Sequence, residues 1–308
     1  MTEQEIQKIQ HGPLMWIDIE NPDIATLNKF KTEYGFHTLD IEDCLSEAQR
    51  SKVDEYDDYL FVILNIPCFD KRKQQVTTEE VDIFIKNNLL ITIHWGTLKP
   101  ITYMFEECQK KDTKRKEFMG HSSGYLLYEL IDLLFAETFP IITTLEKELA
   151  DLEKEAFYFE QPRDLIKDIL NAKKSIIVFK RTMALHRTVI AQIEHKNKKF
   201  LTDDLDVYFD DILDKVEKIW ASLENLDELI ESLQDTNESL ISHTTGDVIK
   251  TLTVFNVIML PLNLVAGMYG MNVALPFASR GETFLMLIGV MCAIVLTMLL
   301  FFKWKRWI

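Results

Sequence analysis

Residues 251–272 read TLTVFNVIMLPLNLVAGMYGMN and contain no Asp, Glu, Lys, Arg or His. The uncharged stretch extends to Ser279, and a second one, from Thr283 to Phe302, is dominated by Leu, Met, Val, Ile and Phe. Each is long enough to cross the hydrocarbon core of a bilayer, which takes roughly 20 apolar residues. We therefore predict a membrane domain over residues 251–308, with transmembrane helices at about 251–271 and 283–302.

The residues that flank these stretches predict the orientation of the chain. Basic residues stay on the cytoplasmic side and tryptophan favours the interface, and the second stretch is followed by Lys303, Trp304, Lys305, Arg306 and Trp307. Two crossings then place the N-terminal part in the cytoplasm, and residues 1–10 contain no apolar signal-peptide core. The four cysteines form no CxxC or other close pair, as expected in a reducing cytosol. We expect a multi-pass protein of the cell membrane with both termini in the cytoplasm.

Charge is distributed unevenly along the 308 residues. The chain has 34 Lys and Arg against 49 Asp and Glu, a formal net charge of -15. Beyond Lys250 the only charged residues are Arg280, Glu282, Lys303, Lys305 and Arg306, so this part carries +3 and residues 1–250 carry -18. The excess of acid argues against nucleic acid as a partner. A charged fraction of 27% excludes a carrier built mostly of membrane helices.

The first 120 residues indicate an α/β cytoplasmic domain. Helical patterns occur near 24–32 and 39–48. Turn formers such as Asn87-Asn88 separate the β-rich stretches at 59–64, 81–85 and 89–93. We expect a small mixed sheet covered by helices.

Residues 121–250 predict a cytoplasmic stalk of long helices. No glycine occurs between Tyr125 and Thr245, and the only prolines there are Pro140 and Pro162. Two apolar seams repeat with the three- and four-residue steps of packed helices. They are Ile169, Ala172, Ile176, Phe179, Met183, His186 and Ile190, and then Ile212, Val216, Ile219, Leu223, Leu226, Ile230 and Leu233.

The second seam continues almost uninterrupted from about Leu205 to Tyr269. A helix that rises about 1.5 Å per residue would extend for roughly 100 Å over this stretch. It would connect the cytoplasmic part mechanically to the membrane, which suggests a sensing role for the cytoplasmic part. The predicted fold class is an α+β cytoplasmic domain with long coiled-coil-like helices and two C-terminal transmembrane helices.

Three asparagines in the first apolar stretch are costly in lipid. Asn256 and Asn263 are two helical turns apart and share a face with Leu260 and Gly267, and Asn272 lies at the end of the stretch. Hydrogen bonds between helices account for one such asparagine, whereas two in register favour a water-filled lumen. Two helices per chain cannot enclose a lumen, so we expect several subunits around an axis.

The first stretch ends at Gly270-Met271-Asn272, preceded by Ala266-Gly267-Met268-Tyr269. Together with the two C-terminal helices, the basic tail and the large acidic domain, this resembles the CorA family of magnesium transport proteins. The resemblance covers nearly the whole chain and includes residues 16–18 (WID), 39–43 (LDIED), 125–128 (YLLY) and 208–211 (YFDD).

The resemblance implies a funnel-shaped homopentamer that transports Mg²⁺ through a pore lined by the first transmembrane helix. At matching positions Gly270, Met271 and Asn272 form the selectivity entrance. The pore-facing residues are Asn263, Asn256, Leu260, Leu252 and Ile249, and the apolar ones are gate candidates. A regulatory Mg²⁺ would lie between Asp43, with Glu42, and Asp211 of a neighbouring subunit.

The chemistry of these residues suits Mg²⁺. The ion gives up its water shell reluctantly, and amide oxygens accept hydrogen bonds from that shell without holding the ion as firmly as a ring of carboxylates. Two charges that move through about 100 mV gain roughly 4.6 kcal/mol, so passive uptake needs no nucleotide. We expect bound Mg²⁺ to hold acids of adjacent subunits together in a closed arrangement, and falling internal Mg²⁺ to release them.

Two alternatives stay open at this point. A transporter of the same architecture could carry Zn²⁺, Co²⁺ or Ni²⁺, although the predicted pore face lacks the His and Cys that these ions prefer. A membrane-anchored coiled-coil scaffold explains the heptads but not the register of the asparagines. An enzyme is not expected, because the sequence has no HExxH spacing and no glycine-rich phosphate loop. The loop after Asn272 contains Glu282 as its sole acid, so an acidic collar at the outer mouth is not expected.

Overall fold

The computed structural model describes residues 5–46, 49–96, 98–158, 162–196, 205–271 and 283–307. The chain divides into two compact units, Met1–Gln234 and Asp235–Ile308. Each unit is described separately below.

Six strands form one mixed sheet within the described part of the first unit. They are β1 (Glu5–His11), β2 (Leu14–Glu20), β3 (Lys52–Glu55), β4 (Leu60–Asp70), β5 (Gln75–Lys86) and β6 (Leu89–His94). Their spatial order is β1-β2-β6-β5-β4-β3, and only β2 and β6 run parallel. The expected mixed sheet is confirmed.

Helices occupy most of the remaining described chain. Two short ones, α1 (Ile24–Tyr34) and α2 (Thr38–Asp43), lie between β2 and β3 in the sequence. After β6 come α3 (Lys99–Lys110), α4 (Asp112–Met119), α5 (Ser123–Ala136), α6 (Phe139–Tyr158), α7 (Pro162–Lys196), α8 (Asp206–Tyr269) and α9 (Thr283–Trp304). The 64-residue α8 begins in the first unit and ends in the second.

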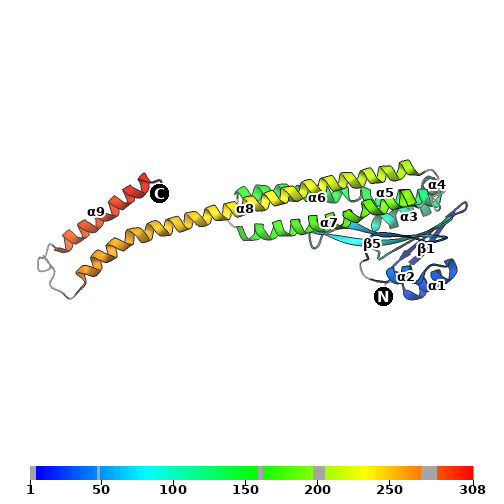
Figure 1. Ribbon diagram of the computed structural model, residues 1–308, viewed down its shortest axis with the longest axis horizontal. Coiled ribbons are helices and arrows are strands. Elements are labelled where there is room, and N and C mark those ends of the chain that lie inside the picture. The colour runs from blue at the N-terminus through cyan, green and yellow to red at the C-terminus, as the bar shows by residue number, and fades with distance from the viewer. Residues whose placement is uncertain are drawn as a thin grey trace. The chain divides into compact units, whose positions relative to one another are not determined.

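The sheet separates two apolar cores because alternate residues of a strand point to opposite faces. On β4, Leu60, Val62 and Leu64 belong to the larger core, and Phe61 and Ile63 belong to the smaller one. The larger core is completed by the long helices and the smaller one by α1 and α2. Figure 1 shows these two sets of helices on opposite sides of the sheet.

Both predicted seams of the long helices are buried in the larger core. Phe179 and Ile219 are each fully enclosed, as are most other members of the two seams. The pattern of three- and four-residue steps therefore predicted α7 and the first half of α8 correctly. α7 contacts β3, β4 and β5, and both helices contribute to the larger apolar core of the first unit.

The helix expected over residues 39–48 is shorter than predicted. α2 ends at Asp43, because the backbone N–H and the hydroxyl of Ser46 both donate to the Asp43 carbonyl, at 3.1 and 3.0 Å. This turn places the Asp43 side chain at the end of α2 and beside β3.

His186 of α7 is enclosed in the larger core. Its Nδ1 atom lies 3.2 Å from the Sδ atom of Met183, and its ring packs on Phe135 with the centroids 5.1 Å apart. The residue is completely buried. Burial lowers the pKa of His186 to about 4, so the ring is neutral at pH 7.

We predict that His186 contributes to acid sensitivity. The unfolded chain takes up a proton on this ring near pH 6.5, whereas the folded chain does so only near pH 4. Stability is therefore lost as the pH falls through this window, by about 3 kcal/mol at its lower end. The thermal unfolding midpoint of the detergent-solubilised chain, measured between pH 7 and 4, checks this.

The His186→Leu variant is the control, because it keeps an apolar side chain in the core and cannot be protonated. Its midpoint should fall less steeply with pH than that of the wild type. Equal slopes for the two proteins would contradict the assignment.

Candidate functional site

Among the described residues, two helices are long and apolar enough to cross a membrane, α8 in its C-terminal part and α9 over Phe284–Trp304. Their most apolar windows are only 6% and 0% buried. A core helix of a soluble protein would be covered by other elements. The exposure of these windows therefore favours two membrane-spanning segments over soluble core helices.

One face of α8 is directed toward α9 within the second unit. Val254 is buried, and Ile258, Leu262 and Val265 follow it on the same face with partial burial. Leu262 lines an apolar groove together with Met291 and Val295 of α9. At the opposite end, the ammonium of Lys250 donates to the Arg306 carbonyl, and Phe302 of α9 is buried like Val254.

The other face of α8 carries the predicted pore residues. All five of them, Ile249, Leu252, Asn256, Leu260 and Asn263, are exposed. At 100° per residue they lie within about 60° of the direction opposite to Val254. Gly267 lies on the same face, and a side chain there would meet no other atom within 4 Å. The structure thus places these predicted pore residues together on one exposed face of α8, directed away from α9. We call this face the exposed stripe of α8.

The predicted selectivity entrance is described only in part. The Gly270 N–H donates to the Ala266 carbonyl at 2.9 Å, and the helix ends at Tyr269. A Cβ atom at position 270 would lie 3.2 Å from that carbonyl, so glycine allows this close turn. Met271 is exposed at the end of the helix, and Asn272 lies outside the described residues.

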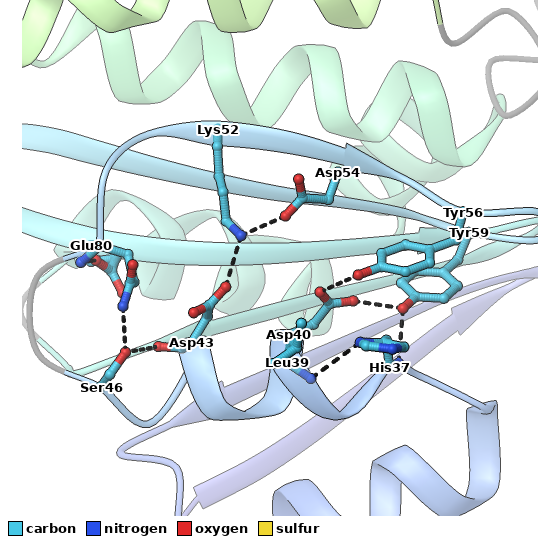
Figure 2. Close-up of polar contacts among 11 residues, drawn as sticks. His37, Leu39, Asp40, Asp43, Ser46, Lys52, Asp54, Tyr56, Tyr59 and Glu80 are labelled. Atoms are coloured by element: carbon cyan, nitrogen blue, oxygen red, sulfur yellow. Dashed lines mark hydrogen bonds and ion pairs between the residues drawn. The ribbon is translucent and has the colours of Figure 1, made fainter.

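The predicted metal ligands Asp43 and Glu42 lie at the end of α2. Glu42 is exposed, whereas Asp43 forms an ion pair with Lys52 of β3 at 2.7 Å (Figure 2). The same ammonium lies 2.5 Å from the carboxylate of Asp54. Burial lowers the pKa of Lys52, but the hydrogen bonds to Asp43 and Asp54 outweigh this effect, and the net pKa is raised.

The third predicted ligand, Asp211, lies in the N-terminal part of α8. Its carboxylate pairs with Lys215 one turn later, at 3.0 Å. Lys215 also forms an ion pair with Asp132 of α5. Here too burial lowers the pKa of the lysine and the two carboxylates raise it, with a net increase.

The sheet separates Asp43 from Asp211 within one chain. Ile41 of α2 is buried in the smaller core on one side of the sheet, whereas Phe209 and Ile212 of α8 belong to the larger core on the other side. No group of three or more metal-binding side chains converges in the described part of the chain. A site that joins these two acids therefore has to draw them from two different chains.

Sequence reasoning missed two buried acids, Asp40 and Asp82, and one partly buried acid, Glu80, next to Asp43. Asp40 is 1% exposed and accepts hydrogen bonds from the hydroxyls of Tyr56 at 2.7 Å and Tyr59 at 2.6 Å (Figure 2). Burial raises its pKa even though these bonds lower it. Burial also raises the pKa of Glu80, and that of Asp82, which lies next to Cys44, rises well above its usual value. These acids are structural neighbours of the candidate site and not open ligands.

Comparisons with known proteins give one consistent result. The profile of the family described as CorA-like Mg²⁺ transporter protein matches residues 12–306. The cobalt/magnesium transport protein CorA of Methanocaldococcus jannaschii is 26% identical over 296 residues, covering 96% of this chain and 92% of that protein. The protein of the same name in Thermotoga maritima is 26% identical over 278 residues, covering 89% and 78%. The complete structure of the CorA magnesium transporter from M. jannaschii superimposes with a TM-score of 0.82 at 25% identity, over 97% and 93% of the two chains.

We predict that Asp40 and Asp43 respond differently to removal of their charge. Asp40→Asn weakens two hydrogen bonds to a buried carboxylate, so the free energy of unfolding should fall by about 1–3 kcal/mol. Asp43→Asn removes a partly exposed ion pair and should change it by less than about 1 kcal/mol. Chemical denaturation of the purified variants measures both values, and the reverse ranking would contradict the assignment of Asp40 as a structural acid and Asp43 as a candidate ligand.

Proposed function

Because the chain belongs to the CorA family of Mg²⁺ transporter proteins, we propose that it is a channel-like transporter for passive Mg²⁺ uptake, driven by the membrane potential. As a member of this family it is a membrane transport protein and not an enzyme. The observation that carries the proposal is the exposed stripe of α8. A helix face that presents Asn256 and Asn263 opposite its packed side suits the wall of a water-filled path.

The path requires further copies of the chain. One copy supplies a single α8 face, and rings of Asn256 and Asn263 arise only when several copies surround an axis. We propose a homopentamer with α8 lining the axis and α9 outside it, in the plasma membrane, with both termini in the cytoplasm. The side of α8 toward α9 is partly buried, whereas the opposite side is exposed, which agrees with this placement.

The proposed path recognises the hydrated ion. Amide oxygens of Asn272, Asn263 and Asn256 accept hydrogen bonds from water that Mg²⁺ retains. Leu260, Leu252 and Ile249 give apolar rings that close the path by excluding water. A membrane potential of about 100 mV supplies roughly 4.6 kcal/mol for a doubly charged ion.

Regulation in this proposal uses Asp43, with Glu42, and Asp211 of the neighbouring subunit. Since one chain holds these acids on opposite faces of its sheet, a Mg²⁺ ion bound to both connects two chains. High internal Mg²⁺ then stabilises the closed arrangement, and its loss allows the acids to repel one another and the subunits to move.

A second ion has a specific argument in its favour. Two relatives are named cobalt/magnesium transport proteins, so Co²⁺ is the first competitor to test, with Zn²⁺ and Ni²⁺ after it. The exposed stripe of α8 contains neither His nor Cys, and Cys292 is on α9. A dehydrated transition-metal ion therefore finds none of its preferred ligands on this face.

Ion flux into proteoliposomes tests the transport proposal. The wild type should take up Mg²⁺ when the inside is negative, and Asn272→Ala should lose most of this flux because the entrance loses its hydrogen-bond acceptors. Measurements with Co²⁺, Zn²⁺ and Ni²⁺ in the same vesicles rank the ions. A well-folded oligomer without flux would support a scaffold, and normal flux in Asn272→Ala would remove that residue from the entrance.

A charge reversal tests the regulatory part. Asp211→Lys places a positive charge where the regulatory ion is proposed to bind, so flux should continue at internal Mg²⁺ concentrations that close the wild type. Flux is measured while internal Mg²⁺ is varied. A variant that closes at the same concentration as the wild type contradicts the role of Asp211.

A further inference from the structure

Asp43 and Asp211, the two acids of the proposed regulatory site, are each paired with a lysine, and each lysine also contacts a second acid. Lys52 lies between Asp43, at 2.7 Å, and Asp54, at 2.5 Å. Lys215 pairs with Asp211 and with Asp132. The two triads lie on different elements and on opposite faces of the sheet, and they repeat the same arrangement of two carboxylates around one ammonium.

A carboxylate that is paired with an ammonium is a weaker ligand for a metal ion, because the two cations compete for the same oxygens. The candidate acids are therefore not free sites in the isolated chain. Lys52 is only 37% exposed and Lys215 is 26% exposed in their side chains, so solvent screens these pairs less than it screens fully exposed ones.

Each second carboxylate offers the lysine another partner. When a cation binds Asp43, Lys52 keeps its contact with Asp54, and Lys215 keeps Asp132 when Asp211 is occupied. The ammonium then never has to remain partly buried without a counter-charge. The second acids thus lower the cost of releasing the ligand acids.

We propose that Lys52 and Lys215 are tethered counter-ions that compete with the regulatory divalent cation, and that Asp54 and Asp132 receive them when the cation binds. The inference rests on the proposed regulatory site and names what sets its affinity. Weakening the site in this way keeps it empty at low Mg²⁺ and occupied only when internal Mg²⁺ is high.

Charge balance favours a divalent cation over a monovalent one at this site. Each triad contains two carboxylates and one ammonium and carries a formal charge of -1. A triad with Asp43 from one subunit and a triad with Asp211 from the next together carry -2. Glu42 beside Asp43 adds a further negative charge, so a doubly charged ion offsets more of this excess than a monovalent ion does.

The test measures the internal Mg²⁺ concentration that halves flux through the full-length protein in proteoliposomes. Lys52→Met and Lys215→Met remove the competitor and should lower this concentration roughly threefold to tenfold. Lys52→Arg and Lys215→Arg keep the charge and should stay near the wild-type value. Lys180→Met removes a comparable ion pair, with Asp227 at 2.6 Å between α7 and α8, and should not shift the concentration.

A double-mutant cycle separates transfer of the lysine from plain loss of negative charge. Asp54→Asn and Asp132→Asn should each raise the half-closing concentration in the wild-type background. Asp54→Asn should have little effect when combined with Lys52→Met, and Asp132→Asn little effect with Lys215→Met, because each second acid acts through its lysine. Equal shifts of the half-closing concentration in both backgrounds would contradict the transfer of the lysine to the second acid.

The outcomes distinguish this inference from the proposed function. If Asp43→Asn and Asp211→Asn leave closure unchanged, the regulatory site itself is wrong. If these variants instead abolish closure while the methionine variants behave like Lys180→Met or raise the half-closing concentration, the regulatory site is supported. In that case the inference that Lys52 and Lys215 compete with the cation is contradicted. Thermal unfolding midpoints confirm that each variant is folded, and Lys52→Gln and Lys215→Gln replace any methionine variant that is not.

Discussion

The structure depends on one constraint, which is that a polar amide in a hydrocarbon environment needs a hydrogen-bond partner or water. The apolar half of α8 presents Asn256 and Asn263 on an exposed face, opposite the side that packs toward α9. A single chain in lipid would leave these amides in contact with acyl chains. Further copies of the chain, arranged so that these faces meet around water, satisfy the constraint and at the same time create a path for a hydrated ion.

A second constraint acts in the cytoplasmic unit, where the sheet keeps Asp43 and Asp211 on opposite faces. In the proposed regulation, neighbouring subunits supply one acid each to a shared cation, so occupancy of the site depends on how the subunits are arranged. Asp211 and Asn256 belong to the same continuous helix, α8. The proposed regulation acts through this helix, whose N-terminal half is anchored by Phe209 and Ile219 in the larger core.

Periodic patterns made much of this fold predictable from the sequence. The seams of α7 and α8 repeat with helical spacing, the two apolar stretches are uncharged and long enough to span a bilayer, and the strands within β4, β5 and β6 are rich in β-forming residues. β1 was not predicted, because the sequence EIQKIQH has few apolar residues at a sheet edge. The buried acid Asp40 was missed for another reason. Its partners Tyr56 and Tyr59 are 16 and 19 residues away, and no local pattern shows which acid of an acidic segment they cover. The lysine bridges of Lys52 and Lys215 likewise join separate elements and become visible only in three dimensions.

The central claim is that the face of α8 with Asn263 lines a water-filled ion path. Its most direct test is cysteine substitution in a Cys292→Ser background, followed by a water-soluble, positively charged thiol reagent and measurement of Mg²⁺ uptake. Modification of Asn263→Cys should block most of the uptake, whereas Val265→Cys, on the side toward α9, should neither react readily nor lose flux. Uptake that persists after complete modification of Asn263→Cys, or a block confined to Val265→Cys, would contradict the account.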